Sequence, residues 1–447
     1  MQPSDLKQLV TQEQLVFLTG SAGTGKSTLT RELIKMVNNP IILGSTGVAS
    51  VLVGGQTYHS FFRINGSSTL TELKSGDESF CKSTGMTIQQ ILSKMTRAIQ
   101  SADMIIIDEV SMISRDHMEC IEYRLQQACV DIPILFVGDM LQLPPVVKSA
   151  NTKYSPHENF IVNHPWWEHV TPVMLQKIWR TDDLDFISAL NKIREGTVDD
   201  EVKTFLKSHR LTPDKFAKID KTKFTFLFGT NSKVRQKNIN ELSKLETKSH
   251  IFNPKLIPMA ITPKNKDYDT FLDNNKISTN LELKVGARVM LIKNKNDYEN
   301  ESQSYVNGDT GVITDIDCSS TPTITIKRDR DGGILYVTEV EFEKIKYENT
   351  GGSLQKIDEF KVTALPIMLA YAITIHKSQG MSISHLIIDA DDLFADSQFY
   401  VAVSRSSDPK NLYISWKKER TNMLIHAITK VNKKMVNYYK SLENKGD

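Results

Sequence analysis

The sequence has few cysteines, and their spacing is not that of a metal site or a disulfide scaffold. The four cysteines are Cys81, Cys120, Cys129 and Cys318, with no CxxC pair and no zinc-finger spacing among them. Free thiols in a reducing compartment are therefore favoured over disulfide bridges, and no metal cluster is implied.

Long apolar runs are also missing. The longest, residues 364–375, contains Pro366 and falls short of the ~20 residues that a membrane helix needs. The first ten residues, MQPSDLKQLV, lack the basic flank and the apolar run of a signal peptide. The sequence therefore predicts a cytoplasmic protein with no membrane partner.

Neither sign of charge is in large excess. The 55 Lys and Arg and the 53 Asp and Glu give a formal net charge of +2. Bulk charge thus neither requires nor excludes a polyanionic partner, so any evidence for nucleic acid must come from local features. With 40% hydrophobic and 24% charged residues among 447, the composition is that of a globular chain of roughly three domains.

Short apolar runs alternate with helical patterns over residues 15–139, which predicts a parallel sheet wrapped by helices. Similar runs return at 224–229, 386–390 and 411–415, which predicts a second α/β domain. Period-two segments with Asn-Gly and Asp-Gly turns lie between them and indicate a small inserted β-barrel. We predict a first domain at 1–195, with a small hairpin excursion at about 63–95, a second at 196–275 and 363–447, and the insertion at 276–362.

Residues 20–27, GSAGTGKS, fit the phosphate-binding pattern GxxxxGK[ST]. An apolar strand pattern precedes them and an amphipathic helix pattern follows, as this loop requires. Lys26 would neutralise the β- and γ-phosphates of a nucleotide, and the hydroxyl of Ser27 would bind Mg²⁺.

A second strand pattern, at 104–107, ends in Asp108 and Glu109. At the edge of an open α/β sheet these carboxylates would lie beside the phosphate loop. Asp108 would hold Mg²⁺ through its water shell, and Glu109 would orient and deprotonate the attacking water, which favours nucleotide hydrolysis over mere binding. A nucleotide kinase needs no such base. The NKxD sequence at 294–297, a guanine-selecting pattern, lies far along the chain in the β-rich insertion and is interpreted as chance.

A third strand pattern leads into VGDMLQLPPV, in which Gln142 is placed to sense the γ-phosphate. The ordered blocks GSAGTGKS, STGVAS, TYHSF, IIIDEVSM, VGDMLQLPPV, ITIHKSQGMSI and YVAVSR resemble superfamily 1 helicases of the PIF (petite integration frequency) family. The similarity covers most of the chain.

The resemblance implies two RecA-like motor domains of the P-loop class with ATP in the cleft between them, and a small Src-homology-like barrel inserted in the second. Lys26, Glu109, Gln142, Arg180 and Arg405 are the implied catalytic residues, with both arginines on the γ-phosphate. Ser27 and Asp108 are the implied Mg²⁺ ligands. The residues expected to bind ATP are Gln2, Gly20, Ser21, Ala22, Gly23, Thr24, Gly25, Lys26, Ser27, Thr28, Gln142, Arg180, Gly380 and Arg405.

The resemblance also points to residues that bind the backbone of a nucleic acid without sequence preference, namely Thr46, Gly47, His59, Asn231, His376, Lys377 and Ser378. Their hydroxyl, amide, imidazole and ammonium groups suit phosphate oxygens. His59 as a structural histidine and Asn231 as a turn residue are the alternatives. Gln2 is the one glutamine at a suitable spacing ahead of the phosphate loop to contact adenine.

We expect an ATP-driven DNA helicase that moves 5′ to 3′ on single-stranded DNA and unwinds partial duplex or quadruplex DNA, as a monomer or as a dimer on DNA. The resemblance supplies the polarity. The absence of long terminal extensions favours a compact bacterial or phage-like motor. Two alternatives remain, namely a RecD-like motor subunit of a nuclease complex and a DNA-dependent ATPase that remodels or displaces bound proteins.

Overall fold

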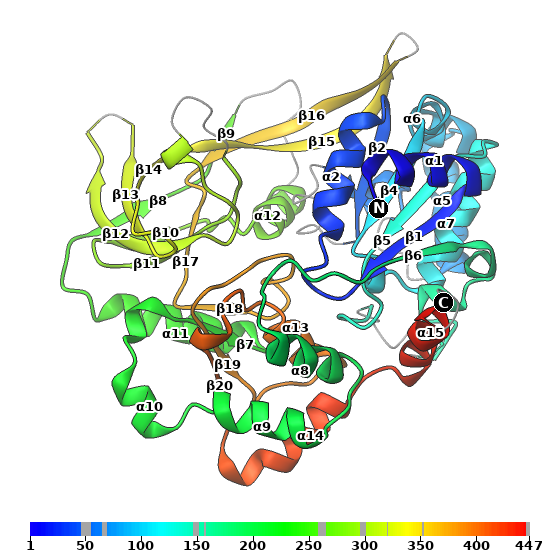
Figure 1. The fold of residues 1–447 in the computed structure, drawn as a ribbon. Coiled ribbons are helices and arrows are strands. Elements are labelled where there is room, and N and C mark those ends of the chain that lie inside the picture. Colours follow the sequence, from blue (N-terminus) through cyan, green and yellow to red (C-terminus); the bar gives the residue numbers. More distant parts are fainter. Residues whose placement is uncertain are drawn as a thin grey trace. The chain divides into compact units, whose positions relative to one another are not determined.

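The computed structural model describes residues 1–45, 55–64, 69–145, 152–155, 158–257, 265–295, 301–319, 321–350 and 353–443. Internal contacts divide the chain into two compact units, coloured along the chain in Figure 1. The first comprises Met1–Trp179, Lys344–Glu359 and Asn432–Asp447, and the second Arg180–Glu343 and Phe360–Val431. The first boundary thus falls before the expected residue 195, and the three-part division drawn from the sequence stays a prediction.

A six-stranded sheet in the order β3-β2-β4-β5-β1-β6 forms the centre of the first unit, and its described pairs are all parallel. Its strands are β1 (Leu15–Gly20), β2 (Pro40–Gly44), β3 (Gln56–Thr57), β4 (Met104–Asp108), β5 (Ile134–Val137) and β6 (Thr171–Leu175). Its helices are α1 (Pro3–Glu13), α2 (Lys26–Met36), α4 (Tyr58–Phe61), α5 (Leu70–Thr84), α6 (Ile88–Gln100), α7 (Arg115–Ala128) and α15 (Lys433–Glu443).

Alternate residues of the central strand pack on opposite faces of this sheet. Val16 and Leu18 of β1 join a core with Leu6 of α1 and Leu33 of α2. Phe17, between them, packs edge-on against Trp167, with ring centroids 5.1 Å apart. Because successive side chains of a strand point to opposite faces, β1 is buried on both, as expected for a sheet covered by helices.

The predicted hairpin excursion at 63–95 is wrong, because the described residues form the helices α5 and α6. The polar residues that suggested turns instead end and begin helices. The Thr69 side chain accepts a hydrogen bond from the Glu72 N–H, and Gly85 closes α5 in the left-handed conformation. Thr87 begins α6 with a reciprocal capping box, in which the side chain of Gln90 accepts from the Thr87 N–H.

The second unit has a four-stranded parallel sheet in the order β18-β7-β19-β20. Its strands are β7 (Thr225–Phe228), β18 (Ala372–Thr374), β19 (Leu386–Asp389) and β20 (Leu412–Ser415). Its helices are α8 (Leu184–Arg194), α9 (Asp200–His209), α10 (Pro213–Lys218), α11 (Asn231–Ser243), α13 (Gln398–Val403) and α14 (Thr421–Thr429).

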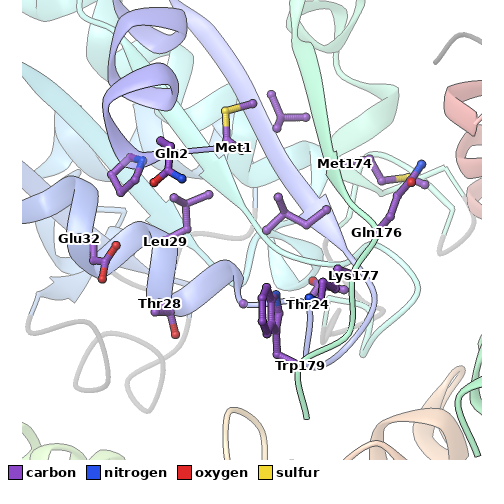
Figure 2. A pocket seen from close by; sticks show the side chains of 14 residues that line it. Met1, Gln2, Thr24, Thr28, Leu29, Glu32, Met174, Gln176, Lys177 and Trp179 are labelled. Carbon is purple, nitrogen blue, oxygen red and sulfur yellow. The ribbon is translucent and has the colours of Figure 1, made fainter. Parts of the chain in front are cut away.

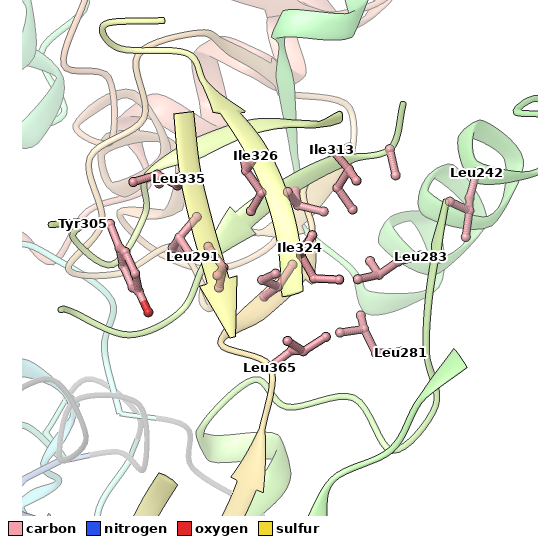
Figure 3. Close-up of a cluster of buried hydrophobic side chains, with 14 residues drawn as sticks. Leu242, Leu281, Leu283, Leu291, Tyr305, Ile313, Ile324, Ile326, Leu335 and Leu365 are labelled. Atoms are coloured by element: carbon pink, nitrogen blue, oxygen red, sulfur yellow. The ribbon is translucent and has the colours of Figure 1, made fainter. Parts of the chain in front are cut away.

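A β-rich insertion separates β7 from β18 in the chain. Its elements are β8 (Ser249–Phe252), β9 (Lys255–Ile257), α12 (Asn265–Asn274), β10 (Leu281–Lys284), β11 (Arg288–Leu291), β12 (Thr310–Asp317), β13 (Thr323–Arg328), β14 (Ile334–Thr338), β15 (Val340–Thr350), β16 (Ser353–Ala364) and β17 (Ile367–Leu369). Five of them form the antiparallel sheet β14-β13-β12-β11-β17. Figure 3 shows its core, in which Leu291, Ile313 and Ile326 lie close to one another and Leu242 projects from α11.

The predicted α/β class, with two parallel sheets and an inserted β-rich segment, is confirmed. Within the described ranges, no helix is long and apolar enough to cross a membrane.

Candidate active site and nucleic-acid interface

The phosphate-binding loop joins β1 to α2, and its glycines adopt conformations that other residues avoid. Gly20, Gly23 and Gly25 have φ angles of 147°, 83° and 88°. A Cβ on Gly20 would lie 2.4 Å from the carbonyl oxygen of Leu175 on the neighbouring strand. The loop therefore needs glycine at these positions, and Gly25 is the residue from which α2 begins.

Lys26 folds its side chain back over this loop. Its Nζ donates to the carbonyl oxygens of Gly20 at 2.7 Å and Ser21 at 3.0 Å. The Thr24 hydroxyl also donates to the Ser21 carbonyl, at 2.9 Å. The ammonium is thus held at the loop that would surround a phosphate, at the N-terminal end of a helix where anions are favoured.

The two carboxylates lie where β4 ends. Asp108 is 9% exposed, and its Oδ1 accepts a hydrogen bond from the Glu109 N–H at 2.8 Å. Burial, and then the neighbouring Glu109 carboxylate, raise the pKa of Asp108 to about 7, against the opposing attraction of Lys26. Glu109 has φ 54°, a strained left-handed conformation of the kind that recurs at functional sites.

The third motif follows β5, whose carboxyl end lies at the same edge of the sheet. Asp139 is fully buried and its Oδ1 accepts from the Leu141 N–H at 3.1 Å. The Gln142 N–H donates to the Asp139 carbonyl at 2.9 Å, and Gln142 is itself buried. Parallel strands β1, β4 and β5 thus place Lys26, Asp108, Glu109 and Gln142 on one edge of the sheet.

A pocket of about 830 Å³ opens beside the phosphate loop, and Figure 2 shows Gln2, Leu29 and Trp179 around it. Thr24, Gly25 and Thr28 line it too. The Trp179 N–H donates to the Gly23 carbonyl at 2.8 Å, while its ring is 68% exposed. The structure therefore places Gln2 in a pocket beside the loop, together with the aromatic side chain of Trp179. The contact of Gln2 with a nucleotide stays a prediction.

The two predicted arginines meet in the second unit. Arg405 is 2% exposed and donates to the Val401 carbonyl at 3.0 Å and to the Ser404 hydroxyl at 2.8 Å. Arg180 donates to the Ser404 carbonyl. Burial and then Arg405 lower the pKa of Arg180 from its ordinary value. Their contact with a γ-phosphate stays a prediction, as does the role of Gly380, which has φ 74°.

Four of the residues predicted to bind nucleic acid follow two adjacent parallel strands. Asn231 is the exposed first residue of α11, after β7, and His376, Lys377 and Ser378 follow β18. The Lys377 ammonium is paired with Asp273 Oδ1 at 2.6 Å. Ser378 is fully buried, and its hydroxyl donates to the Ile375 carbonyl at 2.7 Å. A DNA contact from that hydroxyl stays a prediction.

His59 lies in the first unit, on α4. Its ring lies tilted against that of Tyr58 at a centroid distance of 3.9 Å, and His117 lies edge-on at 4.9 Å. Burial, and then His117, lower the pKa of His59 to about 4, so its imidazole is neutral at pH 7. Thr46 and Gly47 lie outside the described residues.

Sequence reasoning missed Trp179 and Tyr439. Trp179 directly precedes Arg180 in the block KIWRTDD, and a large aromatic just after a strand that borders the phosphate loop was the available signal. Tyr439 gave no signal, because it reaches the site from the far end of the chain.

Comparison with known proteins decides the family. The PIF1-like helicase model matches residues 6–204. The ATP-dependent DNA helicase Pif1 of Campylobacter jejuni is 33% identical over 433 residues, covering 95% of this chain and 94% of that protein. The chain belongs to the PIF1-like helicase family. The predicted resemblance is therefore confirmed. The human helicase PIF1 is 30% identical over 420 residues, covering 91% of this chain and 59% of that protein.

Solved structures of PIF1-like helicases share the fold. A Bacteroides Pif1 double mutant superposes with a TM-score of 0.79 at 24% identity, covering 99% of this chain and 96% of that one. The Pif1 helicase of Candida albicans gives a TM-score of 0.70 at 24% identity, covering 98% of both chains.

Proposed function

We propose that this PIF1-like helicase is an ATP-dependent DNA helicase that translocates 5′ to 3′ on single-stranded DNA and unwinds duplex. The observation that carries the proposal is the single sheet edge at which Lys26, Glu109 and Gln142 follow three parallel strands. A phosphate-binding loop, a carboxylate pair and a polar sensor at one edge suit hydrolysis of a nucleotide. Relatives that match nearly the whole chain are named ATP-dependent DNA helicases.

The loop fits the phosphates of a nucleotide. At Gly20 a Cβ would come within 3 Å of neighbouring atoms, so no side chain fits at that position of the turn. Gly25 starts α2, so the N-terminal N–H groups of this helix border the same loop. Lys26 brings the positive charge. Gln2 and Trp179 line the adjoining pocket, which suits a flat heterocycle such as adenine, with an amide for its polar edge and an indole for its face.

A magnesium ion fits the oxygen donors at this edge. Asp108 is a buried carboxylate with a raised pKa, so a cation beside it would offset the desolvation of its charge. Ser27, in the first turn of α2, offers a hydroxyl, and hydroxyl and carboxylate oxygens are the ligands that Mg²⁺ prefers. When bound, the ion would neutralise charge on the phosphates.

The residues of the chain then divide the work. Lys26 binds and orients the phosphates by charge, which lowers the barrier by stabilising negative oxygens. Glu109, partly exposed at the strand end, takes the proton of the attacking water and orients it. Gln142 is held by its backbone bond to Asp139 and reports the state of the γ-phosphate. Arg180 and Arg405 supply guanidinium charge to the same group.

Single-stranded DNA is the proposed track and forked DNA a proposed substrate. One Bacteroides Pif1 structure, 25% identical with a TM-score of 0.58, is described as a complex with ADP-AlF3 and ssDNA. A second Pif1 structure, with the same identity and TM-score, is described as showing DNA unwinding at forked dsDNA by two coordinating Pif1 helicases. We extend both to this chain, as a monomer on single strands and with a second copy at forks. Quadruplex DNA is a further proposed substrate.

ATP hydrolysis measured with single-stranded DNA, duplex DNA, RNA and no nucleic acid tests the proposal. We expect strong stimulation by single-stranded DNA and, with tailed duplexes, strand separation by the isolated chain. A chain inactive without added partner proteins would favour a RecD-like subunit. ATPase and displacement of a bound protein without strand separation would favour a remodelling ATPase.

A further inference from the structure

A second pocket, of about 740 Å³, lies within the second unit. It is bounded by α11, the end of α12, β10 and β17, and its lining includes Arg235, Asp273, Lys276, Lys284 and Lys377. Of these, sequence analysis assigned a role to Lys377 alone. None of the lining residues belongs to the phosphate loop.

Lys276 is the unusual residue in this pocket. It is 8% exposed, and the hydrogen bond recorded for its ammonium goes to a weak acceptor, the thioether sulfur of Met381, at 3.8 Å. Lysine is rarely buried without a carboxylate partner, because desolvation of the ammonium is costly. The desolvation cost of the Lys276 ammonium therefore argues against a purely structural role for this side chain.

The backbone of Lys276 adds a second cost. Its φ angle is 60°, and it follows the last turn of α12. The Lys276 N–H donates to the Asp273 carbonyl at 3.0 Å and the Ile277 N–H to the Leu272 carbonyl at 2.8 Å. This pair of bonds is the Schellman motif, whose left-handed position is usually glycine. Leu272 and Ile277 are buried in one core, so the conformation is held in place.

Among the described residues, the acidic groups of the pocket lining are bonded to other partners than Lys276. Asp273 on α12 is paired with Lys377 at 2.6 Å. Glu282 on β10 accepts a hydrogen bond from the Ser249 hydroxyl at 2.7 Å. Lys284 donates to the Leu245 carbonyl at 2.9 Å. Arg235 on α11 adds a further positive charge, so cations outnumber acids in the lining.

We propose that this pocket binds a phosphate group of a nucleic acid, with Lys276 and Lys377 as its two ammonium donors. A phosphate offers the oxygen acceptors that the Met381 thioether replaces poorly, and its charge offsets both ammonium groups. The proposal rests on the proposed function and extends the predicted DNA contact of Lys377 to Lys276, which lies outside the motif blocks identified in the sequence. Free inorganic phosphate has the same chemistry and is the alternative source.

The binding should take up a proton. Burial and then Lys377 lower the pKa of Lys276 to about 7, so its amine is largely neutral at pH 8.5 in the free protein and largely charged at pH 6. A bound phosphate raises that pKa again. Affinity for DNA therefore falls as pH rises above about 7. The partly buried His376 next to Lys377 also titrates, so comparison of variants is needed to isolate Lys276.

The test compares the wild-type chain with Lys276→Met, Lys276→Arg and the control Lys284→Met. Affinity for labelled single-stranded DNA is measured by fluorescence anisotropy over salt concentration and from pH 6 to 8.5. Lys276→Met should weaken binding about tenfold at pH 6, the size of one charged hydrogen bond. It should also reduce the salt slope by about 0.7, the value for one phosphate on a single strand. Lys276→Arg should restore affinity and remove the part of the pH dependence that Lys276 causes. Lys284→Met should change little.

Thermal unfolding measurements distinguish a loss of DNA binding from a loss of stability in these variants. Lys276→Met and Lys276→Gly should raise the melting temperature while weakening DNA binding, because both remove the buried ammonium and glycine also removes the backbone strain. Equal DNA affinity, salt slope and pH dependence in wild type and Lys276→Met would overturn the proposal while leaving the helicase function intact. No DNA binding by wild type would instead overturn the proposed function. Stabilisation of wild type by inorganic phosphate, lost in Lys276→Met with DNA affinity unchanged, would assign the pocket to free phosphate.

Discussion

The hydroxyl oxygen of Tyr439 lies 2.5 Å from the hydroxyl oxygen of Thr19, deep in the first unit. The same Tyr439 oxygen accepts a hydrogen bond from the Met140 N–H at 3.0 Å. Thr19 directly precedes the phosphate loop, and Met140 follows Asp139 in the motif that contains Gln142. One hydroxyl from helix α15, on a side chain that is 2% exposed, therefore joins two of the strand ends at the proposed nucleotide site.

Tyr439→Phe should reduce the kcat of ATP hydrolysis more than it raises KM. The substitution removes the hydrogen bonds of the Tyr439 hydroxyl to Thr19 and Met140, but Tyr439 does not line the pocket beside the phosphate loop. Leaving the Met140 N–H without a partner should also cost about 1–3 kcal/mol of stability. Tyr438→Phe is the matched control, since it loses a bond from Trp167 Nε1 at 3.1 Å and nothing at the strand ends. Equal kcat values for the two variants, at a temperature where both are folded, would contradict this role.

Lys26→Ala should abolish tight ATP binding, whereas Glu109→Gln should keep binding and lose hydrolysis. Lys26 lies over the phosphate loop, and Glu109 is the proposed base. Loss of a base that also positions water should reduce turnover by at least ~100-fold. Nucleotide affinity by fluorescence titration and turnover by phosphate release check the two halves. Near-normal turnover by the Glu109→Gln enzyme would contradict the assignment of Glu109 as the base.

Arg180→Ala and Arg405→Ala should leave single-stranded DNA binding nearly unchanged and suppress DNA-stimulated ATP hydrolysis. Both guanidinium groups meet at Ser404, and neither is predicted to contact DNA. Arg405→Lys keeps the buried positive charge but loses the planar guanidinium group with its several N–H donors. DNA-stimulated ATP hydrolysis by this variant should therefore stay impaired. Arg210→Ala, which removes a guanidinium stacked 4.8 Å over the Trp416 ring, is the control. If DNA affinity fell while turnover per bound complex survived, the arginines would belong to the DNA interface.

Unwinding should require a 5′ single-stranded tail. Polarity follows from the family resemblance and not from the charges at the nucleotide site, since such a site serves motors that run in either direction. Paired duplexes with equal 5′ or 3′ tails, tested by strand separation in the presence of ATP, measure it. Activity on the 3′-tailed duplex alone would exclude the 5′-to-3′ assignment while leaving the nucleotide site unaffected.

The local motifs were predictable from the sequence because each is a short segment with its own physical logic. The phosphate loop is specified by glycines between a strand and a helix, and Asp108 and Glu109 end an apolar run. Because the strands are parallel, their carboxyl ends lie at one edge of the sheet, so the motifs that follow them come together there. The segment at about 63–95 was misinterpreted because Thr69, Gly85 and Thr87 are as suitable for helix caps as for turns. The choice between the two depends on which residues the helices bury.

The sequence by itself determined the family, the two parallel sheets, the β-rich insertion and the motifs that meet at one edge of the first sheet. Only the tertiary structure showed that Tyr439 supports that edge, that Trp179 forms part of the pocket beside Gln2, and that Lys276 is a buried cation next to Lys377. Each of these depends on contacts between segments far apart in the chain, 420 residues apart for Tyr439 and Thr19. No local spacing records such a contact, because it is decided by how sheets, helices and cores pack together.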